Sequence, residues 1–183
     1  MSTQQPSRYG RLSIGLHWLM LLLIAAVYAC IELKGNFPKG SETRELLKHW
    51  HFMLGLTVFA LVWLRLLARL IGPTPQPSAS TPFWETLPAR LMHLALYALM
   101  IGLPLLGWAL LSAAGKPTPF FGLELPSLLQ ADRALAGQIK DVHELLGQAG
   151  YWLIGLHAAA ALFHHYLRRD DVLQRMLPQR HLP

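Results

Sequence analysis

Four long apolar stretches constrain the fold of this chain more than any other feature. They cover residues 12–31, 52–71, 91–111 and 145–167. A helix needs about 20 such residues to cross the hydrocarbon core of a bilayer. Because these stretches are apolar on all sides rather than along one stripe, they indicate membrane helices instead of the helices of a soluble bundle. We therefore expect an all-α, integral membrane four-helix bundle, formed as a single domain by residues 1–183.

The composition excludes several other classes of protein. Charged residues make up 14% of the chain, against about 25% in a soluble domain. Disorder is excluded because it needs low hydrophobicity and high charge. A single cysteine, Cys30, excludes an intramolecular disulfide and a cysteine-ligated zinc or iron–sulfur site. The first apolar stretch is too long for a cleavable signal peptide, and no clear cleavage site follows it.

The distribution of charge predicts the orientation of the bundle. With four spans, both termini lie on one side, and that side carries nine arginines, three acidic residues and a net charge of +6. The other side carries seven basic and seven acidic residues and has no net charge. The positive-inside rule then places both termini in the cytoplasm, as expected for a protein of the inner (plasma) membrane. The pI of 9.8 reflects this topology, and we expect no nucleic-acid partner.

Prolines shape the expected connections. The segment Pro73–Pro82 reads as an extended linker. The proline-containing stretch 112–142 is expected to hold a short surface helix, followed by an early start of the fourth helix at Asp132, a good N-cap residue. Pro104 is expected to kink the third helix.

Nine histidines in a chain with only ten acidic residues require an explanation. The antiparallel order places His51 and His143 in an outer layer, and His17 and His157 in an inner layer. His143 and His157 are 14 residues apart, which is about 21 Å and close to four turns, so both lie on one helix face. This pattern suits two haems, each held by two axial histidines. The predicted pairs are His51 with His143 and His17 with His157.

Glycines beside these histidines support the same interpretation. Gly55 and Gly147 each follow a predicted ligand by four residues, and Gly150 lies midway between His143 and His157. A porphyrin needs flat space beside its ligand, which glycine provides. The alternative is close packing of helices through small residues.

Two further residues are candidates for binding cofactor or substrate. Arg65 lies 14 residues after His51, where it could pair with a haem propionate or hold a quinone carbonyl; alternatively it extends to the headgroups. His164 lies seven residues beyond His157 and could contact a quinone headgroup, or simply lie at the interface. His93 could line the inner haem pocket or pack between helices.

The remaining histidines have weaker signals. His49 points away from the face of His51 and is expected at the outer surface. His165 faces away from the ligand face of the fourth helix, and His181 lies in the polar tail.

Several strings of this sequence resemble the bacterial di-haem cytochrome b561 family over nearly the whole chain. They are YWLIGLHAAAALFHHYLRRD at residues 151–170 with Val142-His143-Glu144 before it, RLSIGLHWLM around His17, HLALYALMIGLPLLG from His93, and FFGLELP in the outer loop. The resemblance implies b-type haems on His17, His51, His143 and His157. It also implies a quinone site on the cytoplasmic side near His164, and an electron donor that approaches from the outer side.

The resemblance is strongest to the superoxide:ubiquinone oxidoreductases of that family. All five lysines lie on the outer side, where they could steer a small anion or form an ordinary solvated surface. We therefore expect a di-haem cytochrome that oxidises superoxide and reduces ubiquinone. One alternative is a cytochrome subunit that relays electrons between a partner dehydrogenase or hydrogenase and the quinone pool. A second is a transporter whose histidines bind metal ions or relay protons.

Overall fold

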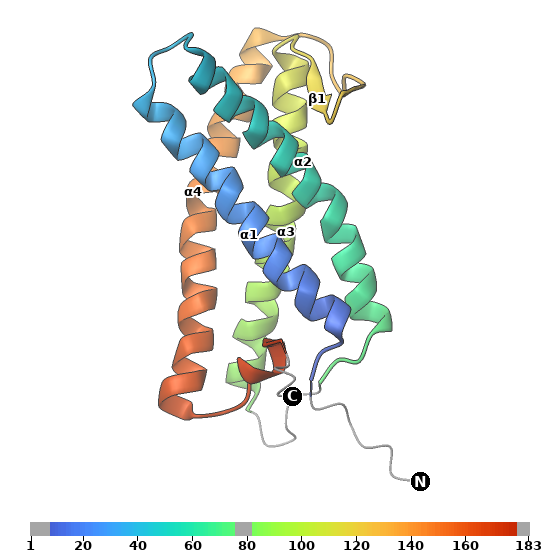
Figure 1. Cartoon of the computed structure of the whole chain (residues 1–183), viewed down its shortest axis with the longest axis vertical. Coiled ribbons are helices and arrows are strands. Elements are labelled where there is room, and N and C mark those ends of the chain that lie inside the picture. The colour runs from blue at the N-terminus through green and yellow to red at the C-terminus, as the bar shows by residue number, and fades with distance from the viewer. Residues whose placement is uncertain (1–7, 76–81, 179–183) are drawn as a thin grey trace, which may run out of the picture.

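The computed structural model describes residues 8–75 and 82–178, and four long helices dominate this part of the chain (Figure 1). They are α1 (Arg11–Leu33), α2 (Glu42–Ile71), α3 (Phe83–Ala113) and α4 (Arg133–Phe163). A π-helical segment, η2 (His164–Arg168), extends α4, and two short 3-10 turns are η1 (Lys34–Asn36) and η3 (Gln174–Met176). His181 and most of the predicted linker lie outside the described residues.

Each of the four helices is long and apolar enough to cross a membrane. Few of their side chains are buried inside the chain, and large apolar ones such as Trp152, Leu70 and Leu167 are among the most exposed. In water such a surface would be costly, whereas a lipid bilayer is its natural solvent. The predicted all-α membrane bundle is confirmed, and the four apolar stretches fall on the four helices with their π-helical extension.

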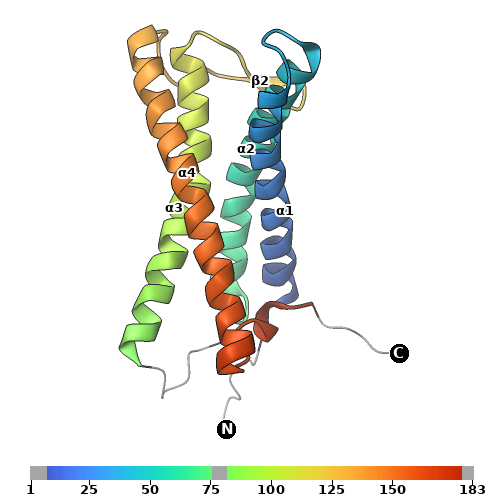
Figure 2. The same cartoon turned by 90° about the vertical axis from the view of Figure 1, so that its left-hand side faces the viewer.

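The helices run up and down, so that α1 begins and α4 ends at the same end of the bundle (Figures 1 and 2). We call this the terminal end, and it also holds the end of α2 and the start of α3. The opposite end, called the loop end, holds the α1–α2 and α3–α4 connections.

The α3–α4 connection differs from the prediction. It forms an antiparallel hairpin of β1 (Thr118–Phe120) and β2 (Leu123–Leu125) instead of a short surface helix. Its two turn residues, Phe121 and Gly122, both have positive φ, at 47° and 84°. Such angles at both central positions are typical of the tight turns that join paired strands, so the expected helix was wrong.

The predicted start of α4 is confirmed in detail. The Asp132 side chain accepts hydrogen bonds from the backbone N–H groups of Ala134 at 2.8 Å and Leu135 at 3.1 Å. Helix α4 therefore begins well before the apolar stretch at 145–167, and its first turns lie outside that stretch. In α3, the helix continues through both Pro88 and Pro104.

The helices associate as two pairs, α1 with α2 and α3 with α4, while α2 also packs on α3. The tightest packing joins α1 to α2 through Met20, Val58 and Val62, all of which are buried. Near the terminal end, the buried Ser13 hydroxyl donates to the Ala68 carbonyl at 3.3 Å. Most buried apolar contacts thus lie within the α1–α2 pair.

Two tyrosines join α1 to α4 across the bundle. The Tyr28 hydroxyl donates to the Gly147 carbonyl at 2.8 Å, and the Tyr151 hydroxyl donates to the Glu32 carboxylate at 2.7 Å. The two rings lie 4.2 Å apart. Gly150 is buried, and a Cβ at this position would collide with the Tyr28 hydroxyl.

This contact gives a test of the packing. Gly150→Ala is expected to destabilise the protein by about 1–3 kcal/mol, because the new methyl group overpacks the site. Tyr28→Phe removes the colliding oxygen at the cost of one hydrogen bond, about 1 kcal/mol. The double variant should therefore lose less than the sum of the two single losses in thermal unfolding in detergent.

Gly155→Ala is the matched control on the same helix, because nothing lies within 4 Å of a Cβ there. A loss at Gly155 equal to that at Gly150, or strictly additive losses at Gly150 and Tyr28, would contradict the collision.

Candidate functional site: a histidine-lined cavity

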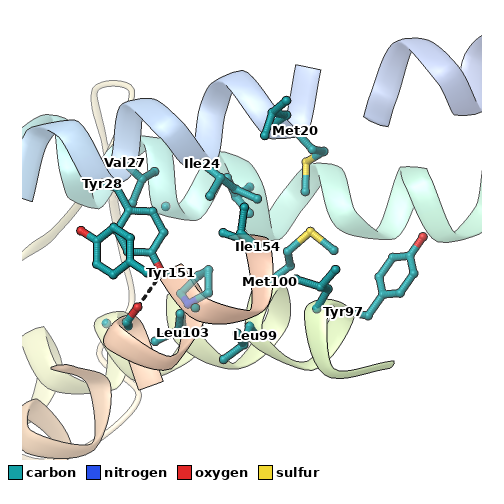
Figure 3. A pocket seen from close by; sticks show the side chains of 18 of the residues that line it. Met20, Ile24, Val27, Tyr28, Tyr97, Leu99, Met100, Leu103, Tyr151 and Ile154 are labelled. Atoms are coloured by element: carbon teal, nitrogen blue, oxygen red, sulfur yellow. Dashed lines mark hydrogen bonds between the residues drawn. The ribbon is translucent and has the colours of Figure 1, made fainter. Parts of the chain in front are cut away.

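A cavity of about 840 Å³ lies between the α1–α2 and α3–α4 pairs and reaches from the loop end to the terminal end. This volume is near the upper limit for small-molecule and cofactor sites. Its middle is apolar: Figure 3 shows side chains from α1, α3 and α4 pointing into the same space. Those labelled there include Ile24, Val27, Leu99, Leu103 and Ile154.

At the loop end, α2 and α4 bring His51 and His143 together across the cavity. Their ring centres are 6.2 Å apart, and the rings are nearly perpendicular at 77°. The His51 Nδ1 atom lies 3.0 Å from the Val27 carbonyl. Because a carbonyl only accepts, Nδ1 carries the proton and Nε2 keeps its lone pair. We call these two residues the loop-end pair.

At the terminal end, α1 and α4 bring His17 and His157 together in the same way. Their ring centres are 6.3 Å apart, at 68°. His93 of α3 joins them, with its ring centre 5.5 Å from that of His157. We call His17 and His157 the terminal-end pair.

The two pairs share one spacing. Two imidazoles on opposite sides of one metal ion, each with a metal–nitrogen bond of about 2.0 Å, have ring centres roughly 6 Å apart. Within residues 8–75 and 82–178, no group of three or more His, Cys, Asp or Glu residues is arranged to hold a metal ion. The spacing within each pair suits a metal that takes two protein ligands and obtains its other ligands elsewhere, as in haem.

Polar atoms in the cavity are left with unused hydrogen-bonding capacity. The Arg65 Nη2 atom donates to His17 Nδ1 at 2.9 Å and its Nε donates to the Tyr97 hydroxyl at 3.2 Å. Its Nη1 atom is buried without a hydrogen-bond partner among the described residues, and so is His143 Nδ1. An unpaired guanidinium nitrogen facing a cavity can bind a carboxylate or a carbonyl oxygen.

The predicted glycines divide into two kinds. Gly55 and Gly147 line the cavity, and nothing lies within 4 Å of a Cβ at either position, so both leave open space beside their histidines. Gly150 also lines the cavity, but Tyr28 lies against it.

A further glycine beside the site, Gly107, was not predicted from the sequence. A Cβ at this position would lie 3.5 Å from His143. Its spacing of 14 residues from His93 could have revealed it.

His164 lies outside this cavity's lining and hydrogen-bonds to Asp170, with 2.6 Å between its Nδ1 and the carboxylate. The chain turns back after His164, and the terminal mouth of the cavity is lined by Val172, Leu173 and Met176. The Trp18 indole N–H donates to the Met176 carbonyl at 2.9 Å and fixes this segment beneath α1.

At the loop end, three lysines line the mouth of the cavity: Lys34, Lys48 and Lys140. Two of them are paired, Lys48 with Glu45 at 2.6 Å and Lys140 with Glu144 at 2.7 Å. His49 is exposed and is not part of the cavity lining, as its position on the helix predicted.

Four membrane-spanning helices around a cavity with two facing histidine pairs are the arrangement expected of a membrane cytochrome. Comparison with known sequences agrees: the family model described as prokaryotic cytochrome b561 matches residues 8–179. The chain belongs to this family, whose members bind b-type haem and transfer electrons in membranes. The family and the four helices together fit a multi-pass bacterial membrane protein.

Individual relatives match over almost their full length. Cytochrome b561 homolog 1 of Escherichia coli K12 is 40% identical over 174 residues, covering 95% of this chain and 99% of the relative. A Yersinia pestis protein named "Probable superoxide oxidase CybB" is 40% identical over 175 residues, covering 94% and 97%. Cytochrome b562 of Cereibacter sphaeroides is 30% identical over 182 residues, covering 97% and 99%.

The Asp170 carboxylate gives a test of the segment that closes the terminal mouth. Burial alone would raise its pKa, but the hydrogen bonds from His164 and the Val172 backbone, with the charge of Arg168, lower the pKa overall. A carboxyl whose pKa is lower in the folded state stabilises the fold above its unfolded-state pKa, and that contribution is lost as the pH falls through the lowered value.

Asp170→Asn should therefore speed tryptic cleavage after Arg168 and Arg169 at neutral pH. Asp171→Asn is the control, because it removes a neighbouring carboxylate that pairs with Arg175 and not with His164. In the wild-type chain, the NMR signal of the Trp18 indole N–H should shift only once the pH falls below the ordinary aspartate range. A shift within that range, or equal cleavage of the two variants, would contradict the role given to Asp170.

Proposed function

We propose that this chain binds two b-type haems, one between His51 and His143 and the other between His17 and His157. The observation that carries the proposal is the recurrence of one spacing, 6.2 and 6.3 Å between ring centres, at the two ends of a single cavity. The family binds b-type haem, and the two imidazoles of each pair would hold its iron without leaving a site for oxygen. Such an iron favours electron transfer over oxygen binding.

The surroundings of the loop-end pair support ligation through Nε2. The hydrogen bond from His51 Nδ1 to the Val27 carbonyl fixes the tautomer and orients the ring, as a bond from the other ring nitrogen of a metal-bound histidine commonly does. Gly55 and Gly147 leave the space that a flat macrocycle needs beside the two rings.

The terminal-end pair also supports haem ligation, but there the Arg65 side chain has to move. Arginine only donates, so His17 Nδ1 accepts its bond from Arg65 and the proton is on Nε2. Ligation through Nε2 needs the opposite tautomer, so Arg65 has to turn away from His17. A propionate carboxylate is the partner that its charge favours, and its buried Nη1 has no hydrogen-bond partner in the described part of the chain.

When bound, the two haems supply one-electron carriers at two depths of the bilayer, between a donor outside the cell membrane and a quinone at the cytoplasmic side. The net +6 charge of the terminal end supports its cytoplasmic position. The apolar middle of the cavity excludes water between the two pairs, and the segment 172–176 covers the terminal mouth. His164, held by Asp170 beside that mouth, is the proposed contact of the quinone headgroup.

We further propose superoxide as donor and ubiquinone as acceptor. In this reaction two superoxide ions each lose one electron, while one quinone takes up two electrons and two protons. Two molecules of oxygen and one quinol result. The support is the name of the Yersinia relative and the lysines at the loop-end mouth, of which Lys34 has no ion pair in the described chain. The relay subunit for a partner dehydrogenase or hydrogenase shares the haem sites and differs in the donor.

Histidine variants test the two haem sites separately. His51→Ala or His143→Ala should remove one of two haems, and His17→Ala or His157→Ala the other, because an axial ligand is lost. Haem per chain, measured from the pyridine haemochrome spectrum of purified protein, should fall by half in each case. His49→Ala, an exposed neighbour, and His93→Ala should keep both haems.

Loss of a haem in His93→Ala together with its retention in His17→Ala would overturn the terminal-end pairing. A colourless wild-type protein would overturn both haem sites and favour the transporter alternative.

The donor is tested by mixing the purified, oxidised protein with a superoxide source and recording the reduced haem α-band. Reduction should be rapid, superoxide dismutase should abolish it, and added ubiquinone should reoxidise the protein. His51→Ala should slow reduction at least tenfold because the loop-end site is lost. Slow reduction of the wild type, together with stable co-purification of a large extracytoplasmic subunit, would favour the relay role.

A further inference from the structure

A second, smaller cavity of about 440 Å³ lies between α2 and α3 at the terminal end. It is lined by Leu66, Arg69, Leu70, Thr74, Arg90, His93 and Tyr97. The terminal ends of α2 and α3 lie apart in both views of the bundle (Figures 1 and 2). On α3, residues 90, 93 and 97 follow helical spacing and so lie on one face.

Among the described residues, the two arginines of this cavity have no carboxylate to pair with. The acidic residues of the terminal end are already engaged, Glu85 by Arg168 at 2.7 Å, Asp170 by His164 and Asp171 by Arg175. Within the described residues, neither Arg69 nor Arg90 forms an ion pair. Two guanidinium groups in one cavity without a counter-charge repel each other and favour an anion between them.

The other residues around the cavity indicate which kind of molecule carries this anion. Leu70 is 82% exposed and its neighbour Leu67 is 52% exposed, so the cavity borders the lipid-facing surface of α2. Arg69 lies in the last turn of α2 and Arg90 in the early part of α3, at the level of the headgroups. Basic pockets between membrane helices on the cytoplasmic side are suited to anionic lipid headgroups.

We propose that this cavity binds the phosphodiester of an anionic phospholipid, with Arg69 and Arg90 on the phosphate and one acyl chain along Leu66 and Leu70. Each guanidinium can make a bidentate contact with a phosphate, which a lysine ammonium cannot. Arg69, His93 and Tyr97 line both this cavity and the large one. The bound headgroup therefore lies one side chain away from the terminal-end histidine pair.

The site is tested by native mass spectrometry of the purified holoprotein with added phosphatidylglycerol or phosphatidylcholine of the same acyl chains. The wild type should retain phosphatidylglycerol at least fivefold better than phosphatidylcholine. Arg69→Gln with Arg90→Gln should abolish that preference. The matched control, Arg169→Gln, removes an exposed positive charge at the same end but outside the cavity, and should keep it.

Three results would overturn the proposal. Equal loss in the Arg169 variant would mean that the preference reflects overall charge. Displacement of phosphatidylglycerol by millimolar inorganic phosphate would assign the site to a soluble anion. Loss of haem from the double variant, with the lipid preference unchanged, would assign the arginines to propionates. Because the readout is the bound lipid, it does not depend on superoxide or quinone being the substrates.

Discussion

The structure depends on how two helix pairs, α1–α2 and α3–α4, are held at a fixed distance across an apolar cavity. Each histidine pair takes one ring from α4 and one from the opposite helix pair. The tyrosine contacts of Tyr28 with Gly147 and of Tyr151 with Glu32 join α1 to α4 directly. In a bilayer there is no hydrophobic gain from helix association, so these hydrogen bonds and the packing of α2 on α3 hold the two pairs in place. A cofactor bound by both sides would then complete the packing of the bundle.

Both ends of the cavity follow from the same antiparallel arrangement but differ in chemistry. The loop-end mouth carries three lysines, two of which pair with glutamates on their own helices, so it is polar. The terminal mouth is covered by the chain that turns back after η2 and is fixed by the Trp18–Met176 bond. Arginines predominate at this end, and they are divided among ion pairs, the histidine cluster and the proposed lipid site. This asymmetry gives the protein a direction across the membrane.

Much of this could be predicted from the sequence because membrane helices follow simple rules. Length and apolarity identified the spans, and the spacing of 14 residues in α4 identified His143 and His157 as lying on one face. Asp132 was recognisable as an N-cap, since capping depends on a local side-chain bond. The hairpin at 118–125 was not recognisable, because it depends on positive φ at Phe121 and Gly122, and a Phe-Gly dipeptide is a weak turn signal.

The sequence by itself determined the class of the protein, the direction of its helices and the depth of each histidine, because these depend only on the position of a residue along a helix. Only the tertiary structure decided which rings face each other, that Gly150 accommodates Tyr28, and that Arg65 contacts His17. It also placed His164 beside the cavity instead of in its lining. The physical reason is that contacts between helices set the rotation and tilt of each helix. The periodicity of a single helix carries no information about those contacts.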